Sequence, residues 1–199
     1  MIDVVHAVAQ LRHDEGIPVD PTRRGPVMLD QFFETVNVRH VMLSQLTMGR
    51  VSKYLQSDGV LIDPLPEPGE KLAGFLFYAG PIGIAFVEAD DILPRRRFTA
   101  AHELGHASMH QHKMGKYHKD DEKSLLENDV AVAEMEREAN AFAAEILMPR
   151  EICSHRAAEL KDEHGVCPRI VLAYRLASEL LVSREAMRYR LRELEIGDE

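Results

Sequence analysis

The sequence has few cysteines, no long apolar run and no excess of positive charge. Its two cysteines, Cys153 and Cys167, do not form a Cys-x-x-Cys pair, so neither a cysteine zinc site nor a structural disulfide is expected. No apolar stretch approaches the ~18 residues that suggest a transmembrane helix. The first residues also lack the basic and apolar segments of a signal peptide. We therefore expect a cytoplasmic protein that does not bind membranes.

The formal net charge of −9 argues against a nucleic-acid-binding surface spread over the whole molecule. Binding to phosphates depends on clustered Lys and Arg, although a local basic patch stays compatible with this charge. A chain of 199 residues with 45% hydrophobic and 29% charged residues is long enough for one globular domain with a core, or one domain with a small appendage.

Apolar periodicity and turn residues predict mostly helices, with one β-rich stretch in the middle of the chain. Two β-prone runs, 72–78 and 82–87, are separated by Ala79-Gly80-Pro81, which is typical of a β-hairpin. This hairpin either borders a substrate cleft as an edge strand or supports a neighbouring helix from behind, and the sequence does not decide between the two. The expected helices cover residues 1–15, 29–36, 44–56, 94–112 and 130–148, with an extended segment at 38–43.

The motif His102-Glu103-Leu104-Gly105-His106 lies in the predicted helix 94–112. Residues four apart share one face of a helix, so His102 and His106 can present two imidazoles to one metal ion, with Glu103 turned aside. This arrangement is typical of zinc metallopeptidases, in which the glutamate is the general base. His106 and His110 are also four apart, but only His102 and His106 bracket a glutamate. A glycine inside a helix costs ~1 kcal/mol relative to alanine, so we expect Gly105 to pack closely against another backbone.

The predicted helix 130–148 offers several glutamates as a third ligand. Glu134, Glu138 and Glu145 share one line of the helix, which favours a solvent-exposed acidic face. We also expect the histidines outside the motif, including His110, to be exposed.

Glu136 instead shares a line with Asn140 that borders the apolar stripe, so its carboxylate points toward the interior. An unpaired buried charge is costly, and a metal ion would compensate it. Asn140, one turn further on, is placed to hydrogen-bond a ligand and fix its orientation. The alternative is a partly exposed ion pair of Glu136 with Arg137 or Arg150.

The run from Arg97 to His106, together with the run from Glu136 to Pro149, resembles the ImmA/IrrE family of zinc metallopeptidases. The resemblance extends over about residues 72–195. It implies Zn²⁺ bound by His102, His106 and Glu136, with Glu103 as the catalytic base. With the predicted elements, it implies an α+β fold, a mostly helical zincin-like metallopeptidase domain with a small β-sheet beside the HExxH helix.

We expect an N-terminal helical segment at 1–70, a zinc metallopeptidase core at 71–165 and a C-terminal helical segment at 166–199 packed on the core. Residues 1–70 carry no family motif. The stretch 176–184 resembles a helix-turn-helix, in which Ser183 is a natural N-cap. From Pro168 to Glu199, however, arginines and acids are equal in number. This balance favours packing or docking of a repressor over contact with DNA.

The resemblance implies a zinc endopeptidase that cleaves a protein regulator, a helix-turn-helix repressor or antitoxin, in bacterial stress response or mobile-element control. Two alternatives remain: a protein that binds the repressor without cleaving it, and a DNA-binding regulator whose metal is structural. The reaction needs a donor to the oxyanion, and Tyr117, His118, His155 and Tyr174 are candidates between which the sequence does not choose.

Overall fold

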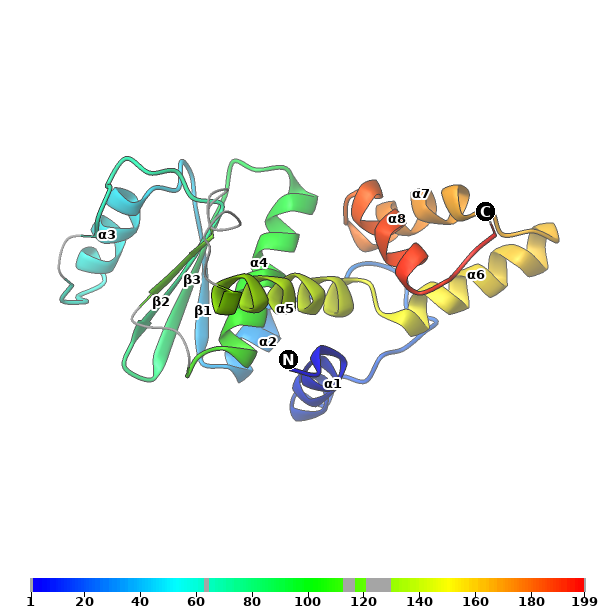
Figure 1. The fold of residues 1–199 in the computed structure, drawn as a ribbon, viewed down its shortest axis with the longest axis horizontal. Helices are drawn as coiled ribbons and strands as arrows, with labels where there is room; N and C mark the ends of the chain where they lie inside the picture. Colours follow the sequence, from blue (N-terminus) through cyan, green and yellow to red (C-terminus); the bar gives the residue numbers. More distant parts are fainter. Residues whose placement is uncertain (1, 63–64, 113–116, 121–129, 199) are drawn as a thin grey trace.

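The computed structural model describes residues 2–62, 65–112, 117–120 and 130–198. In these ranges the chain is mostly helical, with one small sheet, and the architecture is α+β as predicted (Figure 1). The helices are α1 (Val4–Asp14), α2 (Asp30–Thr35), α3 (Met48–Ser57), α4 (Leu93–Met109), α5 (Val130–Leu147), α6 (Arg150–His164), α7 (Arg169–Leu180) and α8 (Arg184–Glu193). The strands are β1 (Val38–Leu43), β2 (Gly74–Ala79), β3 (Ile82–Glu88) and β4 (Tyr117–Asp120).

The sheet has the strand order β1-β3-β2-β4. β1 is parallel to β3, whereas β2 is antiparallel to both β3 and β4. The predicted hairpin is β2–β3, and Gly80 between the strands has a φ of 66°, which favours glycine. Because β1 and β4 flank this hairpin, its strands are interior, and the interpretation of the hairpin as the edge of a cleft is wrong. Its other interpretation, support for a neighbouring helix, is confirmed below.

Alternate residues of the two central strands face opposite sides of the sheet, as the twofold period of a strand requires. On one side, Phe75 and Phe86 pack with residues of α3 such as Val51 and Leu55. On the other side, Leu76 and its neighbours pack with the large core that includes α4 and α5. The sheet therefore has α3 on one face and the remaining helical layer on the other (Figure 1).

α4 and α5 pack against each other, and Gly105 is the point of close approach. A Cβ atom at Gly105 would lie 3.1 Å from the ring of Phe142 on α5. We expected this glycine to make room for another backbone, and the structure shows that it makes room for an aromatic side chain instead. Phe142 is fully buried, and burial of its ring offsets the cost of a glycine at position 105 inside a helix.

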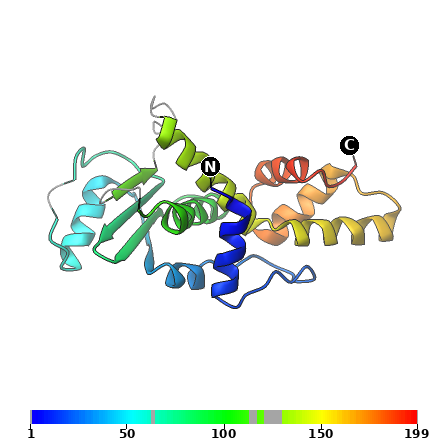
Figure 2. The same cartoon turned by 60° about the horizontal axis from the view of Figure 1, so that its bottom comes forward.

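The N-terminal helix α1 lies against α5 (Figure 2). The guanidinium of Arg12 donates a hydrogen bond to the carbonyl of Ile146 at 3.0 Å. Residues 1–70 also contribute β1 to the sheet. The domain limits at 70 and 165 stay a prediction. In the part of the chain that the structure describes, no helix is long and apolar enough to span a membrane.

The C-terminal helices α7 and α8 are joined by a short turn with Leu181 in the left-handed conformation. Ser183 caps α8, since its hydroxyl accepts a hydrogen bond from the amide of Ala186 at 3.0 Å, as predicted. Arg190 of α8 is buried, pairs with Glu145 of α5 and donates to the carbonyl of Met148. These contacts hold α8 against α5.

Candidate metal centre

Three side chains from two helices converge between α4 and α5. His102 and His106 lie one turn apart on α4, and their Nε2 atoms are 2.9 Å apart. Glu136 of α5 places its carboxylate oxygens 3.2 Å from Nε2 of His102 and 3.3 Å from Nε2 of His106. The relative exposures of His102, His106 and Glu136 are 3%, 0% and 2%, so the cluster is shielded from solvent.

The spacing and chemistry of this cluster fit a divalent metal ion. Its ligand atoms all lie within 4.8 Å of one another. Zinc binds imidazole nitrogen and carboxylate oxygen at ~2.0–2.2 Å, which places neighbouring ligands of a tetrahedral site about 3.3 Å apart. Two imidazoles and one carboxylate are also a typical ligand set of catalytic zinc sites. A bound cation would offset the cost of burying the charge of Glu136.

Asn140 orients the first histidine. Its Oδ1 lies 3.0 Å from Nδ1 of His102. An amide oxygen accepts hydrogen bonds, so the neutral imidazole donates from Nδ1 and keeps the lone pair of Nε2 for a metal. The sequence places Asn140 one turn after Glu136, and the structure brings both residues to the imidazole of His102.

A second hydrogen-bonded chain starts at the other histidine. Nδ1 of His106 lies 3.1 Å from Nδ1 of His110, and Nε2 of His110 lies 2.9 Å from Oε2 of Glu138. The backbone amide of Ile2 donates to the other oxygen of Glu138 at 2.5 Å. With Glu138 as the acceptor, His110 donates from Nε2 and accepts at Nδ1 from His106. His106 then keeps the lone pair of Nε2 for a metal.

The position of His110 and Glu138 corrects two expectations. We expected both side chains to be exposed, but their relative exposures are 0% and 6%. Burial tends to raise the pKa of the Glu138 carboxyl, yet the hydrogen bonds from Ile2 and His110 outweigh it and hold that pKa below its usual value. A helical wheel of residues 130–148 cannot show that the start of the chain covers this side of α5. The spacing of four residues between His106 and His110 is the feature of the sequence that could have indicated that the two imidazoles lie side by side.

Replacing Glu138 with Gln is expected to weaken metal binding about 10–100-fold, because groups that fix the orientation of a ligand have effects of this size. The measurement is metal affinity in competition with a chromophoric chelator. Glu163→Gln, at an exposed glutamate of α6, is the control. Equal affinities of Glu138→Gln and the wild type would show that this chain of hydrogen bonds does not orient His106.

Glu103 is buried between α4 and β2, with no exposed surface. A Cβ atom at Gly74 of β2 would collide with Oε1 of Glu103 and would lie 2.7 Å from Cγ2 of Thr99. The hairpin thus supports α4 directly, and glycine at position 74 leaves the space that the Glu103 carboxylate occupies. Further along β2, burial and then the Glu103 carboxylate raise the pKa of Tyr78 to about 12, so its phenol is neutral at ordinary pH.

Gly74→Ala is expected to displace the Glu103 carboxylate and, for the metallopeptidase that the sequence motif predicts, to lower the rate of peptide hydrolysis by about 10²-fold, the cost of a misplacement of ~1 Å. Metal content should stay that of the wild type, because Glu103 is not in the cluster of His102, His106 and Glu136. Gly69→Ala is the matched control, since nothing lies within 4 Å of a Cβ atom there. Hydrolysis at the wild-type rate in Gly74→Ala would contradict this packing argument.

Two of the candidate oxyanion donors, His155 and Tyr174, contact other parts of the molecule. The side chains of Tyr117 and His118 lie outside what the structure describes. Nε2 of His155 lies 3.5 Å from Oε1 of Glu159, and Tyr174 lies beneath the guanidinium of Arg184.

The arrangement has the groups that hydrolysis of an amide requires: a cluster that could hold a metal ion and the buried carboxylate of Glu103, next to His102 in the sequence. Comparison with known proteins bears on this chemistry. Residues 58–192 match the model of the Peptidase M78 family, described as an IrrE N-terminal-like domain. The match covers more than half of the chain and contains α4, α5 and the cluster between them. No curated protein matches the chain.

Proposed function

Because the chain belongs to the Peptidase M78 family, the ImmA/IrrE metallopeptidases, we propose that it is a zinc-dependent endopeptidase that cleaves a protein regulator. Membership of this family implies a metallopeptidase that acts on a protein substrate. We propose in addition that the metal is zinc, that the enzyme cleaves within its substrate chain and that the substrate is a regulatory protein. The observation that carries it is the convergence of His102, His106 and Glu136, all buried, beside the buried carboxylate of Glu103.

In this proposal His102, His106 and Glu136 hold the zinc ion. When bound, the ion polarises the scissile carbonyl and lowers the pKa of water toward ~7. Glu103 accepts a proton from the attacking water and later donates it to the leaving amine. Asn140 keeps Nε2 of His102 available as a ligand, and His110 does the same for His106.

A structural role for the metal is disfavoured by the number of ligands. Structural zinc sites are closed by four protein ligands, whereas catalytic sites keep one position open. Within the ranges that the structure describes, the cluster has three ligating side chains. An open position supports catalysis.

We propose a helix-turn-helix repressor as the substrate, in bacterial stress response or mobile-element control, on the strength of the family resemblance. Such a substrate would place the protein in the cytoplasm. The test is incubation of the zinc-loaded protein with the repressor encoded beside its gene, followed by mass spectrometry. The proposal expects two fragments that together account for the repressor. A repressor that stays intact in a stable complex would favour the alternative, binding without cleavage.

Direct binding of DNA is the other alternative, because α7, the turn and α8 have the order of a helix-turn-helix. Several arginines of α8 are engaged within the protein: Arg190 pairs with Glu145, and Arg184 lies 4.8 Å from the ring of Tyr174. This favours packing over reading of a groove. DNA binding that disappears in an Arg184→Ala, Arg188→Ala double variant would support the alternative instead.

A further inference from the structure

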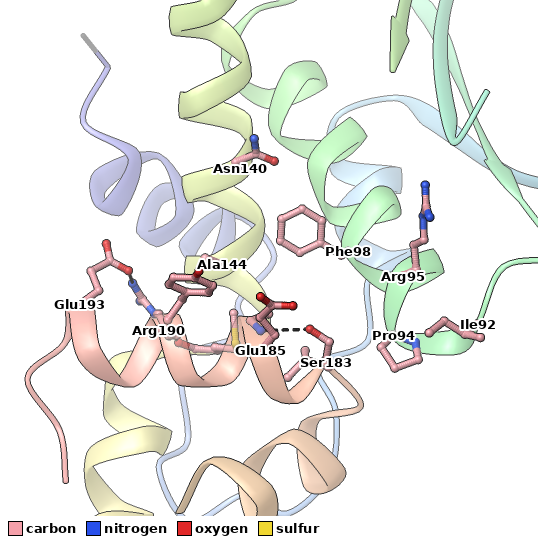
Figure 3. Close-up of a pocket in the computed structure, with 14 residues that line it drawn as sticks. Ile92, Pro94, Arg95, Phe98, Asn140, Ala144, Ser183, Glu185, Arg190 and Glu193 are labelled. Carbon is pink, nitrogen blue, oxygen red and sulfur yellow. Dashed lines mark hydrogen bonds and ion pairs between the residues drawn. The ribbon is translucent and has the colours of Figure 1, made fainter. Parts of the chain in front are cut away.

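A cavity of about 660 Å³ lies beside the metal centre, between the start of α4, one face of α5 and α8 (Figure 3). Asn140 forms part of its wall, and the same side chain lies 3.0 Å from Nδ1 of His102. Phe98, one turn before His102 on α4, also lines it. Asn140 therefore links the wall of the cavity to a histidine of the candidate metal centre.

The wall of this cavity is mainly apolar, and three of the four charged residues that line it, Arg95, Arg190 and Glu193, form ion pairs within the protein. Arg95 pairs with Asp91 at 3.2 Å, and Arg190 pairs with Glu193 at 3.0 Å as well as with Glu145. An occupant that needs ion pairs would have to compete with these contacts, whereas an apolar occupant gains from burial of its own surface. The apolar side chains include Phe98, Ala144, Met148, Val182, Ala186 and Tyr189.

Large apolar residues at this cavity are also exposed. The relative exposure of Ile92, just before α4, is 71%, and that of Tyr189 on α8 is 62%. Exposed apolar surface that borders a cavity is typical of a binding site. A volume of 660 Å³ falls in the range of ~300–1,000 Å³ that holds a ligand larger than one side chain.

We propose that this cavity is the substrate subsite that receives a segment of the target protein with at least two bulky apolar side chains, next to the bond that is cleaved. The inference rests on the proposed peptidase function and adds the specificity of that site. It also assigns a role to α8 and the turn before it, because Val182 of the turn and Ala186 and Tyr189 of α8 form one wall. In this proposal α8, which has the position of the DNA-reading helix in a helix-turn-helix, contributes to the choice of the protein substrate.

The test begins with a library of peptides from a digested bacterial proteome, incubated with the zinc-loaded protein and analysed by mass spectrometry. The proposal expects bulky apolar residues to be enriched at positions close to the cleaved bonds. Ala144→Phe and Ala186→Phe fill the cavity and should lower kcat/KM for such peptides at least about tenfold, mainly through KM, since one misfitted apolar group has this effect. Zinc content and melting temperature check that both variants are folded and loaded.

Matched controls come from outside the cavity. Ala158→Phe adds the same ring at an exposed alanine of α6 and should not change kcat/KM. Tyr189→Ser removes an exposed tyrosine that lies beneath Arg192 in the cavity wall, whereas Tyr174→Ser removes one that lies beneath Arg184 outside it. Tyr189→Ser should raise KM and Tyr174→Ser should not. This pair keeps the proposal testable if the filling variants do not fold.

A second measurement separates failure of this inference from failure of the peptidase function. Zinc-loaded Glu103→Gln is titrated with two fluorescein-labelled peptides of equal length and charge, one with leucines and the other with serines at the same positions. Preference for the leucine peptide, reduced by Ala186→Phe, supports the subsite. Cleavage without apolar enrichment, or a kcat/KM of both filling variants equal to that of the wild type, overturns the proposed subsite. The proposed peptidase function is not affected by either result. No cleavage of any peptide by the wild type, together with no leucine preference, overturns both.

Discussion

Glu103→Gln is expected to lower the rate of peptide hydrolysis by at least about 10²–10⁴-fold, the contribution of a general base, while the metal stays bound. Glutamine has nearly the shape of glutamate, so it fits the space beneath Gly74, but it cannot accept the proton of the attacking water. Glu103 is also separate from the cluster of His102, His106 and Glu136. The measurements are initial rates of cleavage and the metal content of the purified variant.

Glu163→Gln, on the exposed surface of α6, controls for the loss of one carboxylate and should cleave at the wild-type rate. A Glu103→Gln protein that cleaves normally would remove Glu103 from the mechanism. If that variant still relieved repression in cells without cutting the repressor, the protein would act by sequestration. Metal content and cleavage must be measured together, because loss of both would point to a folding defect.

His106→Ala is expected to weaken metal binding by more than the ~10–100-fold predicted for Glu138→Gln, because it removes a ligand and not a group that orients one. The variant should also lose hydrolysis. In the wild type, excess zinc should raise the melting temperature, since a ligand that binds only the folded state stabilises it. In His106→Ala this rise should be absent, and calorimetry with added zinc measures it.

His112→Ala is the control for His106→Ala, since His112 is an exposed histidine shortly after α4. Single alanine variants at His102 and His110 decide between the two histidine pairs. In the structure His110 faces Nδ1 of His106 and Glu138, so His102→Ala should have the larger effect on affinity. A larger effect of His110→Ala would assign the site to the other pair.

The sequence predicts most of the helices and the central hairpin, because each depends on local periodicity and turn residues, whereas the helix α6 was not predicted. Thr47 caps α3, Ser183 caps α8, and α5 ends at Leu147, just before Pro149. The convergence of Glu136 with the two histidines follows from similar reasoning, since one side of α5 must face the core. That these residues bind zinc stays a prediction.

The contacts that sequence reasoning missed depend on which distant segments meet. The strand order could not be predicted because β1 joins the sheet from outside the hairpin and lies parallel to β3. Glu138 seemed exposed because the wheel treats α5 alone, whereas the amide of Ile2 lies against it. Gly105 indicated close packing, but the identity of Phe142 as its neighbour depends on how α4 crosses α5.

The position of Gly74 against Glu103 makes the alignment of two strands a condition for activity. Gly74 pairs with Val87 of β3, and Phe75 pairs with Phe86. Because successive residues of a strand point to opposite sides, a shift of β2 by one residue would turn Phe75 toward Glu103 and expel the carboxylate. Substitutions in β3 that disturb this pairing should thus yield a folded, metal-loaded and inactive protein, even though they lie on a strand that supplies no reacting group.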